Sequence, residues 1–180
     1  MKEINLGEVI EGVISKFCRN RTGPRPRLLA KIPPNLPYLS WQDDGLERFI
    51  KHFLYHTLLM NDPETPVQVI VHERTSLADL EDFVGVYPAY WIQLRIQGHG
   101  SGMIESVVEE VFSDLGYRCE EWIGVEGSSA QLAIFSPLDR EEPKMVFCVD
   151  TVKGIWKCDF LIPVSDRLFL PSFSSPRKKY

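Results

Sequence analysis

The last third of the chain constrains the fold most, because four strand-like segments follow one another there with no helical pattern between them. The segments are 117–125, 130–136, 144–152 and 154–163. Each is rich in β-branched and aromatic residues and is bounded by turn-forming residues. A parallel doubly wound fold would need more crossover helices than this pattern allows. The last two segments predict a hairpin that turns at Val152-Lys153-Gly154.

Helical patterns occur only in the first two thirds of the chain. One apolar stripe runs from Leu6 to Phe17 behind Asn5 as N-cap, and a second covers 46–58 behind Asp43 or Asp44. A third covers 103–115 and ends at Gly116. Segments 27–32, 67–72 and 91–97 predict further strands, and 77–83 predicts a short helix. We therefore expect an α+β fold, a two-layer sandwich of a mixed sheet with about three helices packed on one face.

Length and charge narrow the class of protein. The 180 residues suit a single domain, here 1–170, followed by a flexible tail at 171–180. The net charge of −5 argues against a partner that is a nucleic acid or an anionic membrane. The chain has no apolar run near the ~20 residues that span a bilayer, and its first residues lack the apolar core of a secretory signal. A cytoplasmic location is the expectation.

The four cysteines give no sign of a metal site. Cys18, Cys119, Cys148 and Cys158 are far apart and form no CxxC pair, whereas structural zinc sites use two close pairs. Cys148 and Cys158 could face each other across the predicted hairpin, but in a reducing compartment free buried thiols are the default. No bound metal is expected.

The string Gly98-His99-Gly100-Ser101-Gly102 is the strongest candidate for a binding site. A glycine turn between a strand and a helix presents backbone N–H groups that suit an anion, but it is equally a tight turn that needs positive φ. Ser101 does not match a Gly-x-Ser-x-Gly nucleophile elbow, because His99 stands two residues before it. No histidine follows residue 99, so a serine hydrolase is not expected.

Two histidines, His52 and His56, stand four residues apart in the second helix and so share one face. This spacing can chelate a metal, but no glutamate follows as in a zinc-protease helix, and no third ligand is evident. Ordinary half-buried side chains are the alternative interpretation.

Three stretches together resemble the ATP-binding (catalytic) domain of sensor histidine kinases, the Bergerat or GHKL fold. "INLGEVIEGVISKF" at 4–17 is similar to the lead-in helix of that domain. "LLAKIPPNLPYLSWQDDGLERFIKHFLYHTLL" at 28–59 resembles its strand, proline-rich turn and N-box helix. "GHGSGMIESVVEEVFSDLGYRCEEWIGVEGSSAQLAIFSP" at 98–137 resembles its glycine box, the helix after it and the closing strands. The resemblance covers a core of 4–137, and the predicted hairpin at 144–163 is an addition that could cover the old pocket or form a dimer interface.

The resemblance also shows what this chain lacks. In the family an N-box asparagine holds Mg²⁺, one turn after another polar or acidic residue; the matching positions are His56 and His52. Imidazole is a poor substitute for an oxygen ligand to this hard ion. The glycine-box aspartate that binds the adenine amino group is matched by Gly98, and no residues remain for a flexible lid. Kinase or ATPase activity is therefore not expected, since phosphoryl transfer depends on these parts.

The resemblance thus implies a degenerate module in which His52, His56 and Gly98 to Gly102 mark a vestigial nucleotide pocket. We expect it to act without catalysis by binding a protein partner or a second copy of itself, in bacterial signal transduction. Two alternatives stay open. One is a divergent protein that still binds ATP with Mg²⁺ at the glycine turn, and the other is a small-molecule sensor that uses the same cavity.

Overall fold

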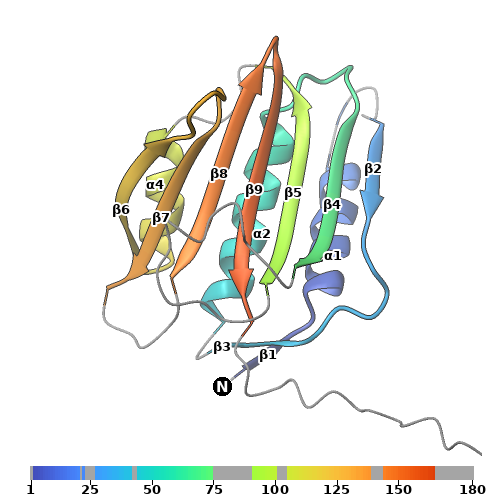
Figure 1. The fold of residues 1–180 in the computed structure, drawn as a ribbon. Helices are drawn as coiled ribbons and strands as arrows, with labels where there is room; N and C mark the ends of the chain where they lie inside the picture. Colours follow the sequence, from blue (N-terminus) through green and yellow to red (C-terminus); the bar gives the residue numbers. More distant parts are fainter. Residues whose placement is uncertain are drawn as a thin grey trace, which may run out of the picture.

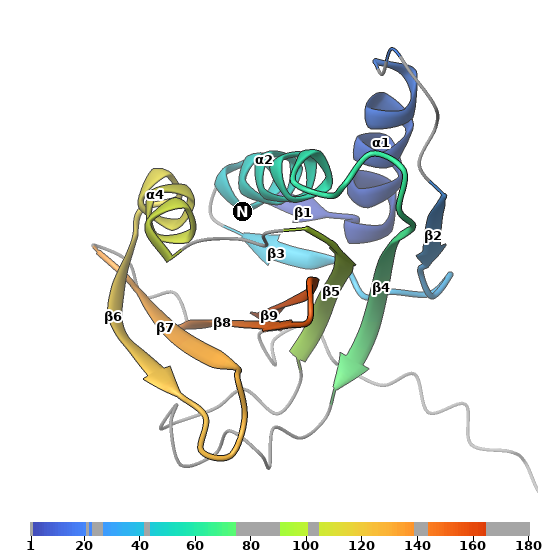
Figure 2. The same cartoon turned by 90° about the horizontal axis from the view of Figure 1, so that it is seen from above.

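The protein is a two-layer α+β sandwich in which helices cover one face of a mixed sheet (Figures 1 and 2). This computed structural model describes residues 2–20, 22, 27–41, 44–74, 91–100, 105–138 and 144–164. The predicted helix at 77–83, the residues Ser101 and Gly102, and the tail at 171–180 lie outside the described residues. Within the described part, the predicted fold class is confirmed.

The main sheet has seven strands among the described residues. Across the sheet they are β2 (Leu28–Lys31), β4 (Val67–Arg74), β5 (Trp91–His99), β9 (Ile155–Pro163), β8 (Met145–Val152), β7 (Gln131–Pro137) and β6 (Tyr117–Gly124). Strands β2 and β4 are parallel, and every other neighbouring pair is antiparallel. The hairpin predicted for the last two strand segments is therefore confirmed as the antiparallel pair β8 and β9. A separate pair, β1 (Lys2–Ile4) with β3 (Leu39–Trp41), was not predicted, because three-residue strands carry too short a pattern.

The three described helices are α1 (Leu6–Arg19), α2 (Gly45–Leu59) and α4 (Glu105–Asp114). Asn5 caps α1 as predicted, since its side-chain oxygen accepts a hydrogen bond from the N–H of Glu8 at 3.2 Å. Asp44 occupies the N-cap position of α2, and within the described ranges its side chain makes no capping hydrogen bond. Gly116 follows α4 with φ of +86°, the left-handed conformation expected just after a helix.

Aromatic rings fill the layer between the helices and the sheet. Phe49 and Phe53 of α2 and Phe112 of α4 are all at most 4% exposed. The ring centre of Phe49 lies 4.9 Å from that of Phe112, and Phe112 stacks on Phe135 of β7 at 3.6 Å. This packing fixes α2 and α4 side by side on one face of the sheet, with α4 on the side of β6 and β7 (Figure 2).

The hairpin of β8 and β9 lies in the centre of the sheet, between β5 and β7 (Figure 1). Its predicted turn is present, with Lys153 at φ 52° and Gly154 at φ 75°. Its rings join the core: Phe160 lies 5.0 Å from Phe49 and Phe147 lies 5.8 Å from Phe53, between ring centres. The hairpin is thus an integral part of the sheet, and not an element added to a complete core as its place after the resembled stretch suggested. Its role in a dimer interface stays a prediction.

The two hairpin cysteines point to opposite faces of the sheet. Cys158 is directly opposite Val149, whereas Cys148 is opposite Asp159, and directly paired residues share a face. All four cysteines are free thiols, and Cys158 is buried. The expected free thiols are therefore found, and the facing pair considered for 148 and 158 is not.

Candidate functional site

The two predicted histidines on α2 are in direct contact. The Nε2 atoms of His52 and His56 lie 2.9 Å apart, so one imidazole donates its Nε2–H to the other. The two rings meet edge to face, with centres 4.3 Å apart, and both side chains are exposed. The helix produces this contact because residues i and i+4 are neighbours on its surface.

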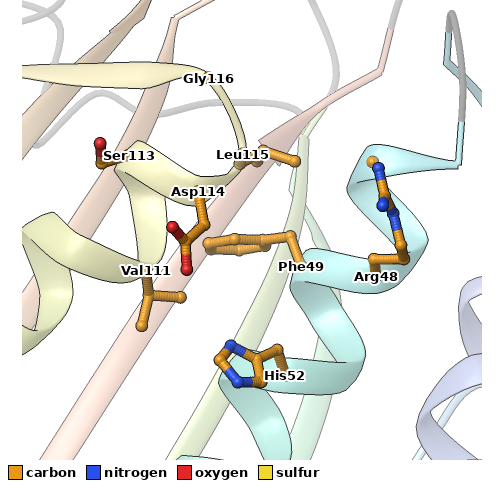
Figure 3. Close-up of a pocket in the computed structure, with 9 residues that line it drawn as sticks. Arg48, Phe49, His52, Val111, Ser113, Asp114, Leu115 and Gly116 are labelled. Atoms are coloured by element: carbon orange, nitrogen blue, oxygen red, sulfur yellow. The ribbon is translucent and has the colours of Figure 1, made fainter.

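His52 also lines a cleft between α2 and α4 (Figure 3). We call this hollow of about 360 Å³ the α2–α4 cleft; its lining residues are Gly45, Arg48, Phe49, His52, Val111, Ser113, Asp114, Leu115 and Gly116. Figure 3 shows the imidazole of His52 on one wall and the carboxylate of Asp114 on the other, with the ring of Phe49 reaching toward Asp114. Asp114 belongs to an acidic helix face that carried no specific signal in the sequence.

The described part of the glycine turn, residues 98–100, forms a tight junction and does not line this cleft. The N–H of His99 donates to Oδ1 of Asn61 at 2.8 Å, and the N–H of Asp62 donates to the carbonyl of His99 at 2.9 Å. Gly100 has φ of +128°, and its N–H donates to the carbonyl of Gly154 at the hairpin turn, at 3.0 Å. The positive φ expected of a tight turn is therefore present at Gly100.

Gly98 is at the most crowded point of this junction. A Cβ atom there would lie 2.3 Å from Oδ1 of Asn61 and 2.5 Å from the indole ring of Trp156. Trp156 is 1% exposed and lies opposite Gly98 on β9. Gly98, which the resemblance pairs with an adenine-binding aspartate, thus has no room for a side chain unless Asn61 and Trp156 move.

Asn61 organises the junction and was not singled out by the sequence. It is 4% exposed, and its amide nitrogen donates to the carbonyls of Asp62 and Thr65, each at 3.0 Å. The only signal at this position was a helix-ending Asn-Asp-Pro string, which predicts a turn and not a contact with a distant strand.

The seven predicted site residues are therefore divided between two places. His52 and His56 are together on α2, Gly98 to Gly100 are at the end of β5, and Ser101 and Gly102 lie outside the described residues. Among the residues that the structure describes, no group of three or more His, Cys, Asp or Glu side chains is placed to hold a metal ion. Two buried nitrogens at the junction, Nδ1 of His99 and Nε1 of Trp156, have no hydrogen-bond partner among the residues that the structure describes.

Comparisons with known proteins give little guidance. No family model and no curated protein matches the chain. Among solved structures, the chain is similar to a mycobacterial sensor histidine kinase, MprB, with 13% identity and a TM-score of 0.43 over 91% of this chain and 99% of that one. A likeness this distant assigns no function to the chain. No helix in the described ranges is long and apolar enough to cross a membrane.

Proposed function

We propose that this chain is a non-catalytic module of the histidine-kinase ATPase type, which acts in signal transduction by binding a protein partner. The observation that carries the proposal is the aromatic packing beneath α2 and α4. Rings from the β8–β9 hairpin, which the resembled stretch does not include, contact Phe49 and Phe53 of the N-box-like helix. A nucleotide cannot enter this layer without displacing fully buried side chains.

Two further features support the same proposal. Gly98 is closed off by Asn61 and Trp156, so an adenine-reading side chain has no place there. The Nε2 atoms of His52 and His56 are hydrogen-bonded to each other, and imidazole is a poor ligand for Mg²⁺. Residues that would clamp a magnesium triphosphate are thus replaced by contacts within the chain.

Exposed apolar side chains favour a protein as the partner. Val152 and Ile155 flank the hairpin turn and are 48% and 42% exposed, and Leu59 at the end of α2 is 54% exposed. The hydrogen bonds of Asp62 and Gly100 connect the end of α2, the glycine turn and the hairpin turn. The three side chains therefore belong to segments that are hydrogen-bonded together at one end of the molecule, which supports a contact surface there.

Nucleotide binding can be tested by thermal unfolding with and without ATP and Mg²⁺. We expect no shift in melting temperature, because only a ligand that binds the folded state stabilises it. A clear shift that is abolished by Gly100→Val would overturn the proposal in favour of the divergent nucleotide-binding protein.

The partner can be tested by placing a photo-crosslinking residue at position 155 in cells that express the chain. The matched control carries the same residue at exposed position 11 on α1. We expect a discrete protein adduct from position 155 alone. Equal adducts from both positions, or none from either, would count against a protein partner at the hairpin end.

The α2–α4 cleft favours a second candidate, a small-molecule sensor. Its volume of about 360 Å³ is within the range of ligand sites, and it combines charged Arg48 and Asp114 with apolar Phe49. A small polar metabolite that raises the melting temperature, with the increase lost in Asp114→Asn, would establish this alternative.

A further inference from the structure

The histidine pair on α2 has the geometry of a chelate for a transition-metal ion. His52 and His56 present Nε2 atoms 2.9 Å apart on one exposed helix face. Two imidazoles four residues apart on a helix are a known way of binding such ions. An ion that binds between them takes the place of the hydrogen that one ring now donates, and the displaced hydrogen can move to Nδ1 of the same ring.

The separation of the two nitrogens indicates the kind of ion. Imidazole nitrogens lie about 2.0–2.1 Å from a bound metal, so two nitrogens 2.9 Å apart subtend an angle of about 90° at a common ion. This is the angle between neighbouring ligands in square-planar and octahedral coordination. A tetrahedral ion would need the nitrogens about 3.4 Å apart at the same bond length.

We propose that His52 and His56 form a two-imidazole site for a divalent ion of nickel or copper type, with water in its remaining positions. Nitrogen donors in this arrangement suit Ni²⁺ and Cu²⁺, whereas Mg²⁺ prefers oxygen. The pair alone is assigned as the ligand set, because the described residues provide no third histidine, cysteine or acidic ligand within reach. The ion would lie beside the α2–α4 cleft, which His52 lines. This inference does not depend on the proposed function.

Calorimetric titration of the untagged protein with NiCl₂ at neutral pH tests the site. We expect one Ni²⁺ per chain in the wild type and no binding of MgCl₂. His52→Ala and His56→Ala should each weaken Ni²⁺ binding on the order of 100-fold, because the second ligand acts at a high effective concentration. His72→Ala removes an exposed histidine on β4 and should leave binding unchanged.

A double variant provides a matched control for spacing. Lys51→His combined with His52→Lys keeps the composition but places the two imidazoles five residues apart, on different helix faces. This variant should bind Ni²⁺ as weakly as the single alanine variants. The inference would be overturned if the wild type did not bind Ni²⁺. It would also be overturned if His52→Ala or the double variant bound Ni²⁺ with the affinity of the wild type. Melting temperatures of all variants without metal show whether each one is folded.

Discussion

Because Gly98 has no side chain, β9 and the segment after α2 can lie close to the backbone of β5. Gly98→Ala would place a methyl group 2.3 Å from Oδ1 of Asn61 and within 2.9 Å of two ring atoms of Trp156. Neither neighbour is the free end of a flexible chain, because Asn61 is held by hydrogen bonds and Trp156 is packed in the core. We expect a loss of about 1–3 kcal/mol in the free energy of unfolding, measured by urea titration.

Gly124→Ala is the matched control for this prediction. Gly124 is exposed on β6, and a Cβ there has no neighbour within 4 Å. Its free energy of unfolding should stay within about 0.5 kcal/mol of the wild type. If Gly98→Ala is as stable as Gly124→Ala, the close contact at the junction does not exist in solution.

The hairpin thiols give a second prediction at the scale of single residues. Burial, with the nearby Asp159 carboxylate, raises the pKa of Cys148 to about 11, and burial also raises the pKa of Cys158 well above its ordinary value. At pH 8 the Cys148 thiolate is then on the order of 0.1% of the total, and thiolate is the species that reacts. We expect iodoacetamide to label Cys18 faster than Cys148 in the native protein, although both are partly exposed, and not to label buried Cys158. In urea all four should be labelled, and native labelling of Cys148 at the rate of Cys18 would contradict its raised pKa.

At the scale of elements, the small β1–β3 pair is attached to α2 through one carboxylate. Glu47 accepts hydrogen bonds from Lys2 at 2.5 Å and from Lys51 at 2.6 Å, and these two cations lower the pKa of Glu47 below its usual 4.5. A lowered pKa in the folded state contributes stability above the unfolded pKa, and this contribution disappears as the pH falls through the folded pKa. Because all three side chains are solvent-accessible, the contribution should be small.

The pH dependence of stability in the wild type and in Glu47→Gln tests this attachment. We expect the wild type to have the higher unfolding midpoint at pH 6 to 7, and the difference to shrink as the pH falls below 4.5 and to vanish once Glu47 is protonated in the folded state. Added salt should reduce the difference at pH 7, since the ions are exposed. A difference that is independent of pH would mean that the Glu47 charge has no role.

The sequence predicted the individual helices and strands better than it predicted which of them lie next to one another. The stripes that begin at Leu6 and Leu46 are long and periodic, and each became a helix that buries that stripe. The hairpin was also predicted, but its place between β5 and β7 was not, because strand order depends on contacts between residues far apart in sequence. The aromatic layer could not be foreseen for the same reason: it joins Phe49 and Phe53 to Phe147 and Phe160 across about one hundred residues.

At the candidate site, too, only contacts between residues close in sequence could be predicted. The contact of His52 with His56 follows from helix periodicity, so it could be predicted. The role of Asn61 depends on the approach of β5, and the crowding at Gly98 depends on Trp156 of the hairpin. A pocket shared by the histidines and the glycine turn was inferred from the resemblance alone, and the chain's own packing assigns these residues to different contacts.

At the scale of the whole molecule, the order of strands predicts how the fold opens. Strand β9 is bonded to β5 on one side and to β8 on the other, whereas β2 and β6 each have one partner strand among the described residues. Amides in the middle of a sheet exchange with solvent only when the sheet separates, and edge amides exchange through smaller openings. We therefore expect amides of β5, β8 and β9 to exchange with the same free energy of opening, equal to that of global unfolding, and those of β2 and β6 to exchange with less.

Native-state hydrogen exchange at several denaturant concentrations measures these free energies strand by strand. An appended hairpin would open by itself, so its amides would exchange at a lower free energy than those of β5. A central hairpin cannot open by itself, because its opening breaks the pairing of β9 with β5 and of β8 with β7. Hairpin amides that exchange more readily than those of β2 would therefore contradict the strand order. They would also contradict the packing of hairpin rings against Phe49 and Phe53, which leaves no space for a nucleotide beneath α2.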